Sequence, residues 1–98
     1  MNKLGILAIL RARPGKETDV QVFLQSAAPL VVAETGTTKW FAFRIDSATF
    51  GIFDTFKDEA GRAAHINGAV AKALFARAEE LFVASPQIQI VDILAEKL

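Results

Sequence analysis

Three observations predict an α+β fold of the ferredoxin-like type. Seven consecutive apolar residues lie near the N-terminus, apolar residues recur at helical spacing in two separate segments, and two adjacent segments rich in aromatic and β-branched residues flank a turn. Their order is strand, helix, strand, strand, helix, strand, in which one antiparallel sheet carries both helices on one face. The 98 residues suit a single domain, which we expect to span residues 1–98.

The first strand is expected over residues 3–13, because residues 4–10 are apolar at every position, as in a strand buried on both faces. Pro14 and Gly15 end it. The first helix follows over residues 16–34, where apolar side chains recur at helical spacing. Within it Pro29 favours a kink, and Gly36 suits the left-handed position just after the helix.

A hairpin is expected from strands over residues 39–45 and 49–56, with residues 46–48 as the turn. Alternation along the strands fixes which side chains share a face. If Ser47 and Ala48 form a two-residue turn, Asp54 lies on the face of Phe41. Asp54 is then a lone carboxylate among aromatic side chains.

The C-terminal part predicts two helices and a strand. Asp58 can cap a short helix over residues 59–65, and Asn67 can cap a second helix over residues 68–84, which Ser85 and Pro86 end. The last strand is expected over residues 87–94. Like the first strand, it offers apolar side chains to both faces of the sheet, whereas the helices cover one face. We therefore expect a homodimer in which two copies pack sheet against sheet.

Composition excludes several classes of protein. With 11 basic and 11 acidic side chains, the chain lacks the surplus of Lys and Arg with which nucleic-acid binders neutralise phosphates. The absence of cysteine and the single histidine exclude disulfides, thiol nucleophiles and a zinc site of nitrogen and sulfur ligands within one chain. Glycine-rich phosphate loops are absent too. Apolar residues make up 52% of the chain, so we expect some apolar surface to face a partner or a ligand.

The N-terminal segment predicts neither export nor membrane insertion. Met1, Asn2 and Lys3 precede the apolar residues 4–10, but this run is too short and no small-residue cleavage site follows it. No other run approaches the roughly 20 apolar residues that span a bilayer. We expect a cytoplasmic protein that binds neither membranes nor nucleic acids.

Two side chains are candidates for acid–base chemistry. His65 is the first, because it alone changes charge near neutral pH at its ordinary pKa; the alternative is contact with the C-terminal carbonyls of its helix, or with solvent. Asp54 is the second, since a buried carboxylate must be hydrogen-bonded, paired or protonated, and each state can serve catalysis. Its alternative role is that of a structural partner of Arg44, Arg62 or a backbone amide.

Four segments, in the order of the predicted elements and over nearly the whole chain, resemble the antibiotic biosynthesis monooxygenase family. They are Arg13-Pro14-Gly15-Lys16, Trp40-Phe41-Ala42-Phe43-Arg44, Phe50-Gly51-Ile52-Phe53-Asp54-Thr55-Phe56, and Asp58-Glu59-Ala60-Gly61-Arg62 leading to Ala64-His65. The resemblance implies a dimeric α/β barrel with a pocket between sheet and helices in each subunit.

The resemblance also implies an activity. Some members are quinol-type monooxygenases that need no cofactor or metal: a hydroxylated aromatic is deprotonated and its anion reduces dioxygen, in a water-poor pocket with a base and a donor to the oxyanion. On this reading His65 is the base or hydrogen-bond donor, and Asp54 orients it or replaces it. The expected substrate-binding residues are Trp40, Phe43, Arg44, Phe53, Phe56 and Arg62.

Two further readings of the resemblance differ in strength. Relatives that degrade haem have an Asn on the first strand and a Trp and a ligating His on the helices; here the first strand has no internal Asn, the Trp is Trp40, and no His follows Gly68. Haem degradation is therefore disfavoured. The alternative to an enzyme is a non-catalytic dimeric barrel that binds a small hydrophobic ligand, since one fold hosts unrelated activities.

Overall fold

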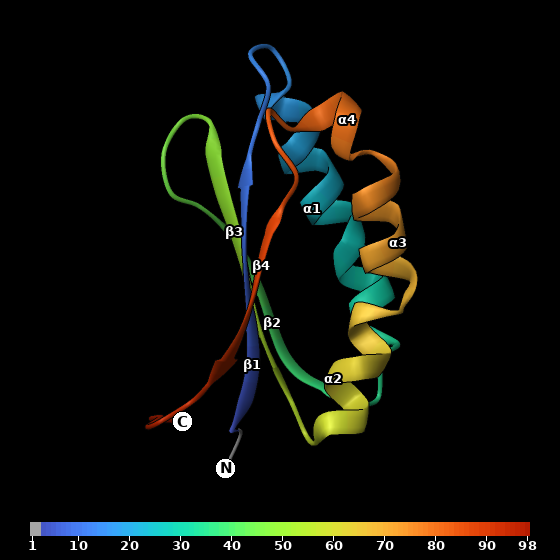
Figure 1. Cartoon of the computed structure of the whole chain (residues 1–98), viewed down its shortest axis with the longest axis vertical. Coiled ribbons are helices and arrows are strands. Elements are labelled where there is room, and N and C mark those ends of the chain that lie inside the picture. The colour runs from blue at the N-terminus through green and yellow to red at the C-terminus, as the bar shows by residue number, and fades with distance from the viewer. Residues whose placement is uncertain (1–2) are drawn as a thin grey trace.

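The computed structural model describes residues 3–98 and confirms the ferredoxin-like α+β fold (Figure 1). Met1 and Asn2, the start of the segment considered as a signal peptide, lie outside the described residues. Four strands form an antiparallel sheet in the order β2-β3-β1-β4. The elements are β1 (Leu4–Arg11), α1 (Glu17–Val32), β2 (Thr37–Arg44), β3 (Thr49–Phe56), α2 (Glu59–Ile66), α3 (Ala69–Ala76), α4 (Ala78–Leu81) and β4 (Gln87–Asp92).

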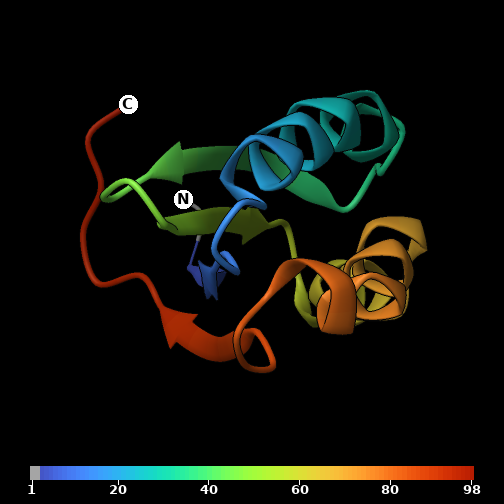
Figure 2. The ribbon, with the colours of Figure 1, turned by 90° about the horizontal axis from the view of Figure 1, so that it is seen from above.

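The helices cover one face of the sheet, and within residues 3–98 no helix lies over the other face (Figure 2). Alternate residues of the central strands β1 and β3, such as Leu10 and Phe50, point toward the helices and are buried. They pack against Leu24 of α1 and Leu74 of α3, which come from the apolar stripes of those helices. Within residues 3–98, no helix combines the length and the apolar character needed to cross a membrane.

The second long helix predicted over residues 68–84 is wrong as a single element. It is divided at Arg77 into α3 and α4, and α3 begins after Gly68. Asn67 does not cap it; instead its side-chain amide donates to the carbonyl of Ala63, at the end of α2. The expected cap of α2 is confirmed, because the Asp58 carboxylate accepts a hydrogen bond of 2.7 Å from the amide of Gly61.

The left-handed conformation predicted for Gly36 is wrong as well, since among the described residues only Gly15, in the turn before α1, has a positive φ. Gly36 is instead required by close approach. A Cβ atom on Gly36 would lie 2.6 Å from the Cα of Gly61, so the chain at the start of β2 lies directly against α2.

The hairpin register also differs from the expectation. The turn consists of three residues, 46–48, rather than two: the amide of Ile45 donates to the carbonyl of Thr49, and the Asp46 side chain closes the turn by accepting from the amides of Ala48 and Thr49. Trp40 therefore pairs with Asp54, so both lie on the helix-facing side. A register shift of one residue moves every side chain to the opposite face, which is why the predicted grouping of Asp54 with Phe41 is wrong.

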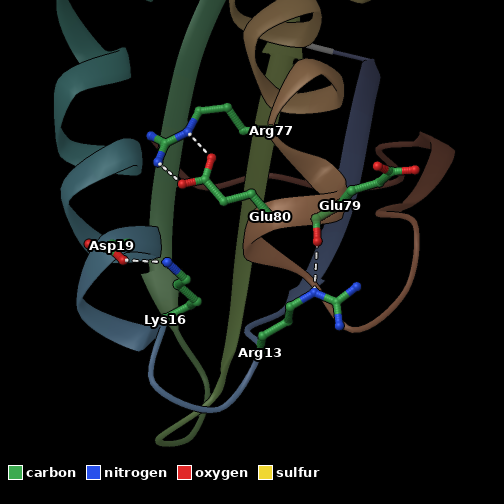
Figure 3. A network of polar contacts seen from close by, with 6 residues as sticks. All are labelled: Arg13, Lys16, Asp19, Arg77, Glu79 and Glu80. Carbon is green, nitrogen blue, oxygen red and sulfur yellow. Dashed lines mark hydrogen bonds and ion pairs between the residues drawn. The ribbon is translucent and has the colours of Figure 1, made fainter.

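Exposed polar contacts connect the start of α1 with α4 at the end of the molecule remote from α2 (Figure 3). Arg13 donates 2.7 Å to the backbone carbonyl of Glu79, and Arg77 pairs with Glu80 at 3.1 Å. A longer ion pair joins the side chains of Lys16 and Asp19, within the start of α1, at 3.7 Å. Such exposed ion pairs contribute little to stability.

Candidate active site

His65 and Asp54, the two side chains selected from the sequence, come together beneath the helices. Asp54 points from β3 toward the helical layer, and His65 lies in the last turn of α2, which the Asp58 cap anchors next to the sheet. The Nε2 atom of His65 lies 2.9 Å from Oδ2 of Asp54. The N–H is not aimed well at this oxygen, and neither Asp54 oxygen has a well-formed hydrogen bond to any described residue. The pair is therefore an ion-pair contact that leaves lone pairs of the carboxylate free.

The other ring nitrogen of His65 faces a second carboxylate. Nδ1 lies 2.6 Å from Oε1 of Glu34, in the connection between α1 and β2. The hydroxyl of Thr37 donates to the same oxygen, also at 2.6 Å. The ring of Phe56 packs against the imidazole with centroids 5.4 Å apart. His65 is thus held from three sides by groups that are distant from it in sequence.

Burial and charge act in opposite directions on His65. The residue is 9% exposed, and burial by itself lowers the pKa of the imidazole because it disfavours the cation. The close contacts with the carboxylates of Asp54 and Glu34 outweigh this effect, so the pKa of His65 is raised above its ordinary value. The two carboxylates therefore stabilise the imidazolium form of His65 relative to the neutral form.

A cavity of about 200 Å³ lies between the sheet and helices α2 and α3, and Asp54 and His65 are the titratable side chains in its wall. The rest of the lining is aliphatic or aromatic: Ile6, Ala8, Ile52, Ile66, Val70, Ala71, Leu74, Phe75 and Ile88. An apolar cavity of about 150 Å³ is large enough to bind benzene, so this one has room for a single substituted ring. Within residues 3–98, no group of three or more His, Asp and Glu side chains is arranged as a metal site.

Three of the residues expected to bind substrate lie elsewhere. Trp40, Phe43 and Arg44 line a separate groove of about 340 Å³ between α1 and β2. Arg44 there donates to the side chain of Gln21 and stacks on the ring of Phe50, so it does not pair with Asp54. The structure does not bring these three together with the acid–base pair.

The other three expected residues have separate positions. Phe56 packs on the imidazole, whereas Phe53, in register with Phe41, lies on the sheet face that the helices leave uncovered. Arg62 is buried and pairs with Glu59 at 3.0 Å, on the helix that carries His65. Arg44 and Arg62 were considered as structural partners of Asp54. Both predictions are wrong, because each arginine has other partners.

Sequence reasoning missed Glu34. It follows the end of α1 in a segment without periodicity, 31 residues before His65, so no local pattern connects the two. It missed the aliphatic lining as well, because Ile6 and Leu74 look like ordinary core positions. Aromatic residues such as Trp40 and Phe43 were predicted to line the pocket from their residue type alone, and they do not line this cavity.

Several solved structures have the same fold as this chain. A protein of unknown function from Nitrosomonas europaea is 51% identical and matches with a TM-score of 0.96 over 100% of this chain and 95% of that chain. An antibiotic biosynthesis monooxygenase matches with a TM-score of 0.80 at 14% identity, over 94% of this chain and 99% of that one. A Caulobacter crescentus protein, provisionally named an antibiotic biosynthesis monooxygenase, matches with a TM-score of 0.78 at 21% identity. The match covers 96% of this chain and 92% of that chain.

These comparisons differ in what they establish. A scan of protein-family models gives no match, and a search of curated proteins gives none. Likeness at 14% and 21% identity establishes the fold, whereas 51% identity over the full chain establishes common membership of a family. The chain therefore belongs to one family with the Nitrosomonas europaea protein of unknown function, and it has the fold of the antibiotic biosynthesis monooxygenases, as its sequence motifs predict.

Proposed function

We propose that this protein is a monooxygenase that needs no cofactor and oxidises a single-ring quinol or polyphenol with dioxygen. The observation that carries the proposal is an imidazole–carboxylate pair in the wall of an otherwise apolar cavity with room for one aromatic ring. The shared fold with antibiotic biosynthesis monooxygenases supports the reaction class. Site and substrate are inferred from the cavity itself.

Proton removal is assigned to Asp54. Its carboxylate is 1% exposed, lines the cavity and has free lone pairs, so it can accept the hydroxyl proton of a bound quinol. The transfer neutralises Asp54 and leaves the negative charge on the substrate. The imidazolium of His65 then faces the new anion instead of the old one. The number of buried charges stays constant, which keeps the cost of making an anion in an apolar site low.

Oxidation follows from the electron-rich anion. One atom of dioxygen forms a C–O bond at a ring carbon, the ring C–H bond is broken, and the other atom leaves as water. The quinol becomes a hydroxyquinone and supplies all four electrons, so no further reductant is required. Apart from Asp54 and His65 the lining is apolar, so little of the wall can hold water next to the anion.

Oxygen uptake with a panel of one-ring and two-ring quinols tests the proposal. We expect uptake with one-ring substrates, and a loss of about 100-fold or more in kcat in Asp54→Asn and His65→Ala. Glu79→Gln is the control, because the structure gives that exposed side chain no contact near the cavity. Arg44→Gln tests whether the groove at β2 is the substrate site instead.

Two results would contradict the proposal. Absence of uptake with every quinol would exclude the activity, and uptake unaffected by either cavity substitution would exclude the site. A thermal shift with small apolar aromatics but no oxygen chemistry would favour a ligand-binding module, since any ligand of the folded state raises its stability by mass action.

We also propose that two copies pair through the sheet face opposite the helices. On this face Phe41, Phe53 and Leu7 lie side by side in one row across β2, β3 and β1. Phe41 is 55% exposed, which is unusual for a large aromatic side chain within a sheet. Pairing through this face leaves the cavity, on the helical side, inside each subunit.

A further inference from the structure

His65 lies in the wall between two hollows. Its ring borders the apolar cavity on one side, and on the other it borders an outer groove of about 440 Å³ between the α1–β2 connection and helix α2. Glu34 lines the outer groove and does not line the cavity. The side chain of Glu34 is 21% exposed, so it reaches His65 from the solvent side.

The contacts of Glu34 fix the proton on Nδ1. Its Oε1 atom accepts from the hydroxyl of Thr37 and lies 2.6 Å from Nδ1 of His65. At this distance a bare ring nitrogen would place its lone pair against a carboxylate oxygen, so Nδ1 must carry hydrogen and donate. With Nδ1 protonated, the ring can hold a second proton on Nε2, opposite Asp54. The arrangement therefore favours the imidazolium.

Few other charges face this ring. Asp54 approaches from β3 and Glu34 from the α1–β2 connection. On α2 itself the neighbouring charged side chains, Glu59 and Arg62, pair with each other at 3.0 Å. Helix α3 contributes apolar side chains to the cavity wall. Within the described chain, the two carboxylates are thus the groups that set the charge of the imidazole.

We propose that Glu34 is a positioning residue that acts on the reaction through His65, an inference that rests on the proposed function above. From outside the cavity it holds Nδ1–H, keeps the ring in the plane that presents Nε2 to Asp54 and the substrate, and maintains the cation that faces the substrate anion. Glu34 touches no atom of a substrate in the cavity. Its effect is therefore expected in kcat and in the pH range of activity, with KM unchanged.

Glu34→Gln is the sharpest variant, because the amide oxygen of Gln still accepts from Nδ1–H and from Thr37 while the charge is removed. The chain has one histidine, so ¹⁵N-histidine labelling gives a single imidazole to follow by NMR. We expect the midpoint of its titration to move to lower pH in Glu34→Gln and to stay in place in the control Glu79→Gln. The kcat of Glu34→Gln should also begin to fall at lower pH than that of the wild type. At the alkaline pH where the two profiles differ most, we expect the kcat of the variant to be about tenfold lower.

Two further variants guard against a folding defect. Thr37→Val removes the hydroxyl that orients Glu34, and we expect a smaller movement of the titration in the same direction. Glu34→Asp keeps the charge on a shorter side chain, and we expect partial return toward the wild-type titration. A purely structural role would alter stability without moving either the imidazole titration or the pH profile.

The outcomes separate this inference from the proposed function. If oxygen uptake depends on His65 but the titration and pH profile of Glu34→Gln equal those of the wild type, the role of Glu34 is refuted and the function stands. If the titration moves but no quinol is oxidised by the wild type, the function is refuted, and with it the catalytic part of the inference.

Discussion

His65, the one histidine of the chain, lies between two carboxylates in the wall of an apolar cavity. Isolated burial of an imidazole would make it neutral, but contacts of 2.9 Å to Asp54 and 2.6 Å to Glu34 reverse this tendency and raise its pKa. The alternative positions considered from the sequence, on the surface or at the helix carbonyls, are wrong because the ring is buried between carboxylates. A titratable group whose pKa is shifted by charged neighbours, in the wall of an apolar cavity, is a candidate for a functional site.

The raised pKa of His65 predicts how stability depends on pH. The folded state binds the proton more tightly than the unfolded chain, whose ordinary value is 6.5. The stabilisation is therefore fully present below about pH 6.5 and is lost as the pH rises through the folded-state pKa. Urea unfolding of wild type and His65→Gln over about pH 5 to 9 measures it. The difference in unfolding free energy should shrink as pH rises, and a constant or growing difference would contradict the assignment.

Helix α2 is the element that decides where His65 lies. It has only two turns and depends on its ends: Asp58 caps the N-terminus, and Gly61 allows the first turn to lie against Gly36. Because a short helix has little intrinsic stability, these local contacts and its packing on the sheet hold it in place. The position of the His65 ring is thus coupled to residues that do not line the cavity.

Removing the cap of α2 is expected to destabilise the protein. Asp58→Ala should lower the free energy of unfolding by about 1 kcal/mol, since it leaves the amide of Gly61 without its acceptor. Asp58→Asn is the matched control, because Asn is about as good an N-cap as Asp. Urea denaturation measures both. Equal loss in the two variants would show that charge, not the cap hydrogen bond, is what matters.

Gly61→Ala sets two effects of opposite sign against each other. Alanine favours the helix by about 1 kcal/mol, but its Cβ would lie 2.7 Å from the backbone oxygen of Gly36, an overpacking worth about 1–3 kcal/mol. We expect net destabilisation in urea unfolding and a changed imidazole spectrum, because α2 must move. Ala60→Gly, at an exposed position of the same helix, should cost stability through propensity without altering the imidazole spectrum. A stabilised Gly61→Ala variant would contradict the close packing.

The whole molecule has two unlike sheet faces. Helices bury one face, and the other carries Leu7, Phe41 and Phe53 in one row with Phe43 and Ile9 in the next. Part of the apolar excess of this small domain therefore lies on the sheet face that the helices leave uncovered. Two sheets packed through such faces would share one apolar core, as in other sheet-on-sheet assemblies.

A charge on the open face tests self-association. Phe41→Glu should convert a dimer into a monomer, because a carboxylate in the apolar row would be desolvated without a partner. Val22→Glu, at an exposed position of α1, is the control and should leave the assembly unchanged. Sedimentation at micromolar concentration distinguishes the species. A monomeric wild type would refute sheet-to-sheet pairing.

Local patterns were sufficient to predict the order of the elements and the cap of α2. The uninterrupted apolar run predicts a buried strand, helical spacing predicts α1, and Asp58 as a capping residue predicts the start of α2. The choice of His65 and Asp54 also came from the sequence, by chemistry and elimination, because a chain with one histidine and no cysteine offers few groups that move protons.

Tertiary structure alone decided which groups meet. The sequence does not contain the register of the hairpin in any local pattern, so the face on which Asp54 lies depended on the actual length of the turn. Glu34 reaches His65 only because the Gly36–Gly61 contact brings the α1–β2 connection against α2. Spacing along the chain determines the local elements, but contacts between distant segments arise from packing, and both the cavity and the raised pKa of His65 are products of that packing.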